Sequence, residues 1–127
     1  MLTFGHLFAI GIGAAAGAVS RWLLGLWLNH SGVMMPWGTL AANLIGGYLI
    51  GVVLGVIAIY PATPAWARLL LMTGFLGGLT TFSTFSGETI GMIERGSYAI
   101  ALGYVGISLL GTLALTVLGM ATVHAMH

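Results

Sequence analysis

The stretch Gly74-Phe-Leu-Gly77-Gly78-Leu-Thr80-Thr81-Phe82-Ser83-Thr84-Phe85-Ser86-Gly87-Glu88 decides how this chain folds. It places glycines, hydroxyls, two aromatic rings and a carboxylate inside a segment whose flanks are apolar. Glycine pairs followed by Thr and Ser weaken a helix, and an interrupted helix at bilayer depth is stable only where protein or a wet cavity surrounds it. We therefore expect a helix break around residues 77–80, with an ion or permeation site beside it.

The composition is that of a membrane protein. The 127 residues are 59% hydrophobic and 4% charged, whereas a soluble domain carries roughly 25% charged residues. The three arginines are scattered and no lysine is present, so the sequence offers no basic patch for binding nucleic acid. The absence of cysteine excludes a disulfide framework, a thiol nucleophile and a thiolate metal site. No nucleophile and base occur together in a span, so we do not expect an enzyme.

Four apolar runs predict an all-α integral membrane protein made of one transmembrane domain. Each run is long enough to cross a bilayer, which takes about 20 residues, and the expected spans are residues 4–28, 37–60, 66–93 and 98–123. Their short connections make neighbouring spans antiparallel. The amino terminus lacks a basic region and a cleavage signal, so we expect the first span to be retained.

The arginines give almost no orienting charge. If both termini lie on one side, that side holds Arg68, and the other holds Arg21 and Arg95. The positive-inside rule then counts one charge against two. The chain can therefore insert both ways, so that inverted copies pair about an axis in the membrane plane, as in transporter repeats. The alternative is one orientation, set by the weak bias or by the terminal amine.

Phe82 and Phe85 lie three residues apart, on one face of the third span, and Glu88 follows one turn later on that face. An aromatic ring is positive at its edge. Two ring edges turned toward a cavity can hold a small anion without a formal charge that would trap it. The alternative is that both rings only fill core volume.

Further polar side chains lie within the spans. The side chain of Asn43 either donates a hydrogen bond to an anion or forms a hydrogen bond between helices. The fourth span carries a hydroxyl at every fourth position, at Tyr104, Ser108, Thr112 and Thr116. These hydroxyls either form a polar track along one helix face or serve packing and hydrogen bonds to carbonyls of their own helix. A break in the third span also frees backbone carbonyls, which suit hard cations such as sodium.

Two charged residues lie inside the spans. Arg21 and Glu88 are functional candidates by depth, although Arg21 can instead reach the interface or cap carbonyls, and Glu88 can pair with a hydroxyl such as Thr39. The histidines all lie at span ends or in loops and receive no metal role: His6, His30, His124 and His127.

Three motifs resemble those of the small four-helix fluoride channels called Fluc or CrcB. They are Gly13-Ala-Ala-Ala-Gly17-Ala-Val-Ser-Arg21-Trp22, Gly38-Thr39-Leu-Ala-Ala-Asn43-Leu, and the stretch from Gly74 to Ser86. The resemblance covers essentially the whole chain. It implies an antiparallel, dual-topology homodimer with two pores, in the cell (inner) membrane as a multi-pass protein. The implied function is passive, fluoride-selective conduction that exports fluoride from the cytoplasm and relieves its toxicity.

The resemblance also implies roles for individual residues. The fluoride pore would be lined by Asn43, Phe82, Phe85, Tyr104, Ser108 and Thr112, with supporting polar groups at Arg21, Thr39, Ser83, Glu88 and Thr116. The carbonyls of Gly77 and Thr80 from both subunits would hold a structural sodium ion, with no organic cofactor. A proton-coupled fluoride exporter is the alternative, but it needs a titrating relay, and Glu88 stands alone without a second carboxylate or a histidine.

Overall fold

The computed structural model describes residues 2–29 and 34–127, so His30 lies outside the described residues. Every regular element in this part of the chain is helical. The elements are α1 (Phe4–Leu28), α2 (Trp37–Ile59), α3 (Ala65–Arg68), the π-helix η1 (Leu69–Leu76), α4 (Gly77–Leu79), α5 (Phe82–Glu94) and α6 (Tyr98–Met126).

Four helical stretches are long and apolar enough to cross a membrane, which confirms the expected number. The third of them, Ala65–Glu94, comprises α3, η1, α4 and α5. The last helix continues to Met126, beyond the expected end at residue 123. The other helical stretches start and end close to the expected residues, because uninterrupted apolar runs fix where a chain can cross a bilayer.

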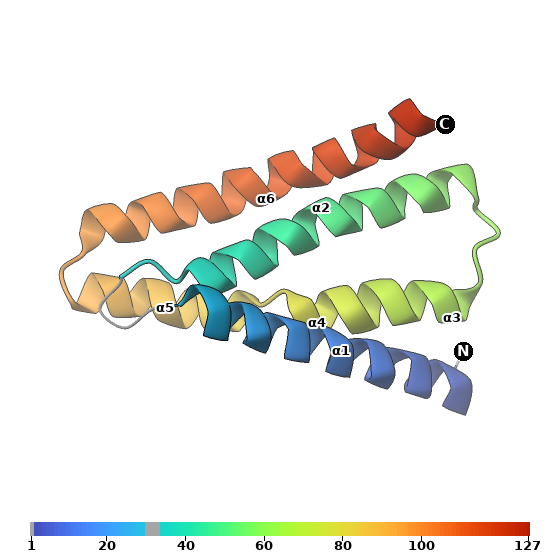
Figure 1. Ribbon diagram of the computed structural model, residues 1–127, viewed down its shortest axis with the longest axis horizontal. Coiled ribbons are helices and arrows are strands. Elements are labelled where there is room, and N and C mark those ends of the chain that lie inside the picture. The colour runs from blue at the N-terminus through green and yellow to red at the C-terminus, as the bar shows by residue number, and fades with distance from the viewer. Residues whose placement is uncertain (1, 30–33) are drawn as a thin grey trace.

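Consecutive spans run in opposite directions, so α1 is parallel to the third span and α2 is parallel to α6, and both termini lie at one end of the bundle (Figure 1). Helix α6 packs along α2, while α1 packs against η1 and α4 and, more weakly, against α2. The beginning of α6 also contacts α5. The third span therefore crosses from α1 to α6 along its length, and its two halves have different neighbours.

Glycine allows the helices to touch backbone to backbone. A Cβ on Gly17 would lie 2.7 Å from the Leu79 nitrogen, and one on Gly78 would lie 3.0 Å from the Ala18 nitrogen. On the other side of the bundle, a Cβ on Gly47 would lie 2.9 Å from the Thr112 carbonyl oxygen. These distances are too short for a side chain, so glycine at these positions lets the helix backbones approach closely.

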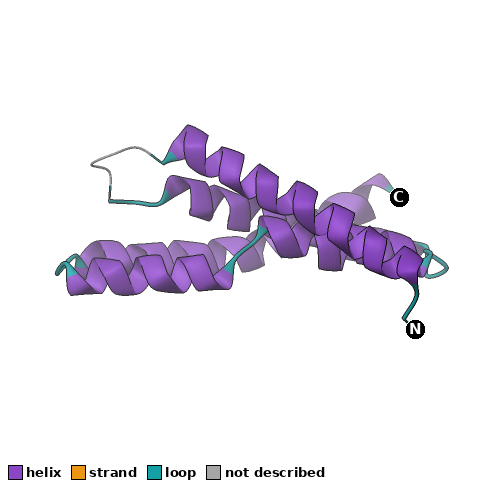
Figure 2. Ribbon diagram, turned by 90° about the horizontal axis from the view of Figure 1, so that it is seen from below, coloured by secondary structure: helices purple, strands orange, loops and turns teal. Residues whose placement is uncertain are grey.

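The third span is broken at Thr80 and Thr81, slightly later than the glycine pair suggests. Thr80 has a ψ of 155°, and Thr81 has φ −150° and ψ 125°, so both are extended. Gly77 and Gly78 remain helical, and α1 packs on Gly78 at backbone contact. Figure 2 shows the break as a short loop in the middle of the span.

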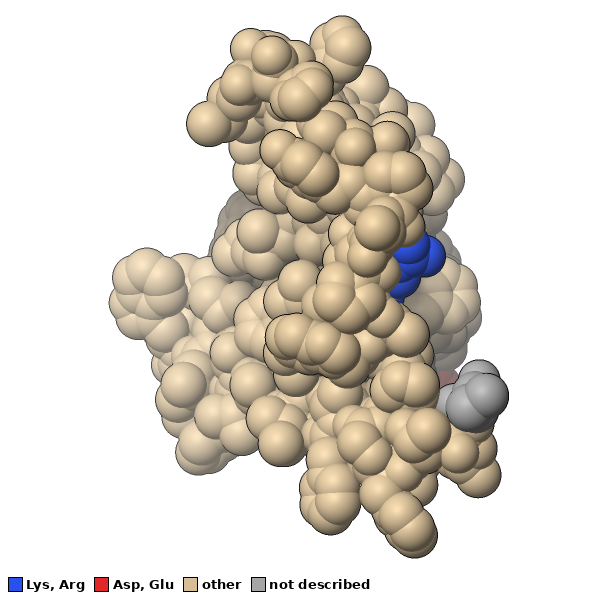
Figure 3. All heavy atoms as spheres, turned by 90° about the vertical axis from the view of Figure 1, so that its right-hand side faces the viewer, with Lys and Arg blue, Asp and Glu red and all other residues tan. Residues whose placement is uncertain are grey.

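The molecular surface matches a bilayer environment. Large apolar side chains are exposed along the helices, among them Phe8, Leu110 and Val117. Viewed from the end that holds the termini, the surface is almost entirely uncharged, with one small group of basic atoms (Figure 3). Because water is absent from the bilayer core, the informative groups are the few polar ones that face inward.

Candidate functional site

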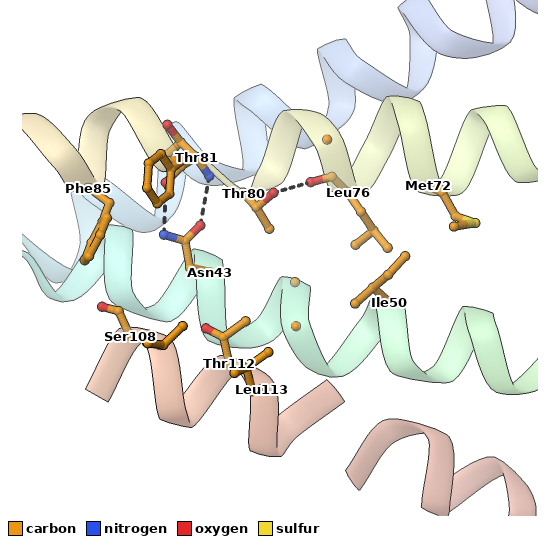
Figure 4. Close-up of a pocket in the computed structure, with 15 residues that line it drawn as sticks. Asn43, Ile50, Met72, Leu76, Thr80, Thr81, Phe85, Ser108, Thr112 and Leu113 are labelled. Atoms are coloured by element: carbon orange, nitrogen blue, oxygen red, sulfur yellow. Dashed lines mark hydrogen bonds between the residues drawn. The ribbon is translucent and has the colours of Figure 1, made fainter. Parts of the chain in front are cut away.

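A pocket of about 480 Å³ lies beside the break in the third span. Its walls come from α2, from the third span on both sides of the break, and from α6 (Figure 4). The polar side chains in its wall are all neutral, namely Asn43, Thr80, Thr81, Ser108 and Thr112, and the rings of Phe82 and Phe85 complete that part. The remainder is apolar or glycine and includes Ile50, Met72, Leu76, Gly77, Leu109 and Leu113.

Phe82 and Phe85 form a ring pair at this pocket, as their spacing predicts. Their centroids lie 5.7 Å apart with the planes tilted by 44°. Phe85 also packs on Tyr104, with centroids 5.0 Å apart, and this contact anchors it to the core. Phe82 is 80% exposed. One ring is therefore held by the chain itself, and the other projects from its surface.

Two hydroxyls of α6 reach the pocket without a hydrogen-bond partner among the described residues. Ser108 is 8% exposed, and its Oγ is buried and unpaired. The Thr112 hydroxyl also has no partner in this part of the chain. Buried polar groups are almost always paired in native structures. An unpaired hydroxyl in a pocket wall is therefore a donor available to whatever enters.

Asn43 faces the break from α2. Its Oδ1 accepts a hydrogen bond of 2.8 Å from the Thr81 N–H, and its Nδ2 donates one of 3.1 Å to the Thr81 carbonyl. The interhelical hydrogen bond considered for this residue is therefore present. One N–H of the carboxamide remains, since an Asn amide has two. The structural and the donor interpretations of Asn43 are thus compatible.

The structure divides the predicted polar track of α6. Ser108 and Thr112 line the pocket, whereas Tyr104 and Thr116, the first and last residues of the track, do not. Tyr104 is fully buried, and its hydroxyl donates to Glu88 across 3.0 Å. Thr116 donates to the carbonyl of Gly47 across 2.9 Å and to its own helix. The i, i+4 spacing correctly places all four on related turns, but their partners differ.

Glu88 lies away from the ring pocket, because six residues of helix α5 turn it by about 120° from Phe82. Thr39 donates to one carboxylate oxygen across 3.1 Å, and Tyr104 donates to the other. The pairing with Thr39 was one of the two interpretations of this residue, and the structure contains it. Glu88 instead lines a second pocket, of about 270 Å³, together with Arg95 and three methionines.

Arg21 caps the third span just before its break. Its Nε donates a hydrogen bond of 3.1 Å to the carbonyl of Gly78. A cation at the carboxyl end of a helix also complements the helix dipole. Ser83, one of the supporting polar residues, is exposed and lies 3.3 Å from the Thr81 hydroxyl.

The carbonyls of Gly77 and Thr80 fit the ligands that a hard cation requires. In a continuous helix they would accept from N–H groups four residues later. Here the Thr81 N–H turns to Asn43, and the Thr84 N–H bonds to the Thr81 hydroxyl. Within the described residues, both carbonyl oxygens are left without a hydrogen bond, and both residues line the pocket.

Sequence reasoning missed two features of this site. It assigned no role to Thr81, which bonds to Asn43 and caps the start of α5, although Thr is a favoured residue at a helix N-cap. It also missed Gly46, where any side chain would collide with the methyl group of Thr80. That contact joins segments far apart in the chain and leaves no local signal.

Comparison with known proteins supports the same interpretation. The family model described as CrcB-like protein, Camphor Resistance (CrcB), matches residues 8–120. The chain belongs to the CrcB family. This membership confirms the family expected from the three motifs, and with the four spanning helices it makes the chain a multi-pass membrane protein.

Curated relatives of this CrcB-family chain are similar over nearly their whole length. A protein of Bordetella petrii named fluoride-specific ion channel FluC is 62% identical over 122 residues, which cover 96% of this chain and 94% of the relative. A protein of Bordetella avium with the same name is 63% identical over 121 residues, which cover 95% of this chain and 94% of that relative. A protein of Chromohalobacter salexigens with the same name is 52% identical over 121 residues, which cover 94% of this chain and 91% of that relative.

Proposed function

We propose that this CrcB-family chain forms a passive, fluoride-selective channel that exports fluoride from the cytoplasm and relieves its toxicity. The observation that carries the proposal is the unpaired Ser108 hydroxyl, buried in a pocket that also presents Asn43 and the two phenylalanine rings. The names of its relatives support fluoride as the ion. The role is one of transport, not of catalysis.

The chemistry of the pocket suits a small, strongly hydrated anion. A pore must replace the hydration shell of the ion with groups of its own. The free N–H of Asn43, the hydroxyls of Ser108 and Thr112, and the positive ring edges are neutral donors. Because none of them carries a full charge, they stabilise the anion without holding it so tightly that it cannot leave.

A second, inverted copy completes the pocket in this proposal. Phe82 is 80% exposed and the pocket lies open at the surface of one chain. Polar groups at bilayer depth require cover by protein or water. The antiparallel homodimer supplies that cover, gives two pores, and accounts for the weak charge bias between Arg68 on one side and Arg21 and Arg95 on the other. We place the dimer in the cell inner membrane.

A structural sodium ion at the dimer centre is the second part of the proposal. One chain offers the hydrogen-bond-free carbonyls of Gly77 and Thr80. Hard cations are held by several oxygen ligands, and the four carbonyls of two chains come closer to such a set than the two carbonyls of one chain. An inverted second copy doubles the set around a shared axis. When bound, the ion would link the subunits and balance the carbonyl dipoles at the break.

A proton-coupled exporter is less well supported. It needs a titrating group on the permeation path. Glu88 lies outside the pocket that holds the two rings, and each of its carboxylate oxygens already accepts a hydrogen bond, from Thr39 and from Tyr104. A group held in this way is suited to fixing neighbouring side chains.

Fluoride efflux from liposomes tests the proposal. Vesicles that contain purified protein and fluoride are followed with a fluoride electrode after addition of a potassium ionophore, without a proton gradient. We expect rapid efflux that depends on the ionophore and excludes chloride. Efflux only under a proton gradient would support the exporter, and equal passage of chloride would contradict selectivity.

A reporter at the carboxyl terminus tests the dual topology. In an antiparallel dimer, the reporter should be found on both sides of the membrane in equal amounts. If every copy places it on one side, the inverted pairing is wrong, whatever the efflux measurement shows.

A further inference from the structure

The break in the third span creates an unusual requirement for Thr81. In a helix, the N–H and the C=O of one residue point in opposite directions along the axis. Thr81 is extended, so both groups point to the same side, as they do in a β-strand. Without partners, two buried backbone groups would each carry a cost comparable to a lost hydrogen bond.

Asn43 meets this requirement with a single side chain. Its carboxamide accepts from the Thr81 N–H across 2.8 Å and donates to the Thr81 carbonyl across 3.1 Å, as the paired dashed lines in Figure 4 show. The pair resembles the double hydrogen bond that two facing residues exchange in an antiparallel sheet. A carboxylate or a hydroxyl at this position lacks either the donor or the reach for both bonds.

Thr81 in turn fixes the start of α5. Its hydroxyl accepts from the Thr84 N–H across 3.2 Å, which makes it the N-cap of this helix. Phe82 is the first residue of α5, and Phe85 lies one turn later. Any shift of Thr81 therefore moves both rings.

We propose that Asn43 is a positioning residue, whose two hydrogen bonds to Thr81 hold the break in register and aim Phe82 and Phe85 at the pocket. This role is separate from any bond that the remaining N–H makes to an anion. It rests on the proposed function, since fluoride selectivity is the property that depends on ring placement.

A backbone ester at Thr81 separates the two roles of Asn43. Incorporating the α-hydroxy acid analogue of threonine at residue 81 removes the N–H that Asn43 accepts and leaves every side chain in place. Liposome efflux of fluoride and chloride is then measured in parallel for the wild type, the ester, Asn43→Ala and the combination. All four are measured in high sodium, because the ester also weakens the Thr80 carbonyl.

The ester should lower fluoride efflux about tenfold, the change expected from losing roughly one hydrogen bond of barrier stabilisation. It should also lower the ratio of fluoride to chloride efflux, because loosened rings select less well. Asn43→Ala should lower efflux by a smaller factor in the ester than in the wild type, since two changes that break one contact are not additive.

Two control variants break similar bonds elsewhere. The same ester at Thr63 removes a 3.1 Å bond from its N–H to the Tyr60 carbonyl, in a turn at the far end of the bundle. Asn29→Ala removes a 2.8 Å bond from the Gly38 N–H to an asparagine side chain. Both should leave the fluoride to chloride ratio unchanged, even where they reduce the yield of folded protein.

The outcomes separate the inference from the function on which it rests. If the wild type passes no fluoride, the proposed function fails. If the wild type conducts and the Thr81 ester keeps its efflux and its ratio, Asn43 does not position the break. Fully additive losses from the ester and Asn43→Ala would also overturn the inference, because they would show that the two groups act separately.

Discussion

Tyr104 and Glu88 are joined by a hydrogen bond of 3.0 Å between the phenol and one carboxylate oxygen. The phenol ring itself packs on Phe85, with centroids 5.0 Å apart. Glu88 therefore holds Tyr104, and Tyr104 supports one of the two rings at the pocket. Tyr104, which the spacing predicted as the first residue of a polar track, lies behind the pocket wall and supports Phe85 there.

Tyr104→Phe tests this support. The variant keeps the ring contact with Phe85 and removes only the hydroxyl, so the free energy of unfolding should fall by about 1.5 to 3 kcal/mol, the value for a bond to a charged group. Fluoride efflux per folded protein should stay within about threefold of wild type, which corresponds to a barrier change below about 0.7 kcal/mol. A loss of tenfold or more in a well-folded variant would place the hydroxyl on the permeation path.

Ser108→Ala should lower fluoride efflux without lowering stability, the reverse of what we expect for Tyr104→Phe. Its hydroxyl is buried and unpaired, and an unsatisfied group of this kind costs about 1 to 3 kcal/mol. Removing it should leave thermal stability unchanged or higher, while fluoride efflux falls about tenfold for each ~1.4 kcal/mol of lost stabilisation.

Ser20→Ala is the matched control for this prediction. Ser20 is partly exposed, and its hydroxyl donates to the Ala16 carbonyl of its own helix. Its efflux should equal that of the wild type. Full efflux from Ser108→Ala, measured beside a thermal melt, would show that the unpaired hydroxyl does not meet the ion.

The spans were predictable from the sequence because apolar length alone determines what can cross a bilayer. The existence of the break was predictable as well, from glycines and hydroxyls within an apolar run. Its position was predicted only to within a few residues. Gly77 and Gly78 have the weakest helix propensity, yet they stay helical, with α1 packed on Gly78, and the chain is extended at Thr80 and Thr81 instead.

The spacing of the fourth span correctly predicted which residues share a face, but it could not predict their partners. The Tyr104 hydroxyl reaches Glu88, and Thr116 bonds to Gly47 and to its own helix. Of these four hydroxyls, those of Ser108 and Thr112 have no hydrogen-bond partner among the described residues. Likewise, the contact between Asn43 and Thr81 joins residues 38 positions apart, and no local pattern encodes it.

Gly17→Ala should prevent α1 from packing on the third span. A Cβ there would lie 2.7 Å from the Leu79 nitrogen and would also collide with the Phe75 carbonyl. Forcing a methyl group into a packed contact costs about 1 to 3 kcal/mol or more, so we expect a lower thermal midpoint and a smaller folded peak on size exclusion.

Gly11→Ala is the control, since nothing lies within 4 Å of a Cβ at that position. Alanine favours a helix over glycine by up to about 1 kcal/mol, so this variant should be as stable as the wild type or slightly more so. Equal behaviour of the two variants would contradict the backbone contact between α1 and α4.

Removal of sodium should impair the channel. The carbonyls of Gly77 and Thr80 accept no hydrogen bond from any described residue, and unsatisfied carbonyls at bilayer depth are costly. Efflux from protein purified and assayed in lithium or choline salts should fall, and the dimer peak on size exclusion should weaken. Unchanged efflux and an intact dimer without sodium would speak against the carbonyl site, while leaving the ring pocket untouched.

Phe82→Ile tests whether a ring edge, and not merely apolar volume, is needed at the pocket. Phe82 is 80% exposed on a single chain, so its replacement removes little packing from the chain itself. Volume-conserving swaps cost less than about 1.5 kcal/mol even in cores, and we expect the variant to fold and elute as the wild type does. Isoleucine has no positive edge to offer an anion. Fluoride efflux should therefore fall, by about tenfold for each ~1.4 kcal/mol of lost stabilisation at the narrowest step.

Phe8→Ile provides the comparison, because Phe8 is 67% exposed on α1 and lines neither pocket. Any general effect of exchanging an exposed ring for isoleucine should appear in both variants, whereas loss of a ring edge at the pore should appear only in Phe82→Ile. Each efflux trace is read beside a size-exclusion profile from the same preparation. Wild-type efflux from a well-folded Phe82→Ile protein would mean that apolar volume suffices at this position, and that the donors for fluoride are the hydroxyls of α6 and the carboxamide of Asn43 alone.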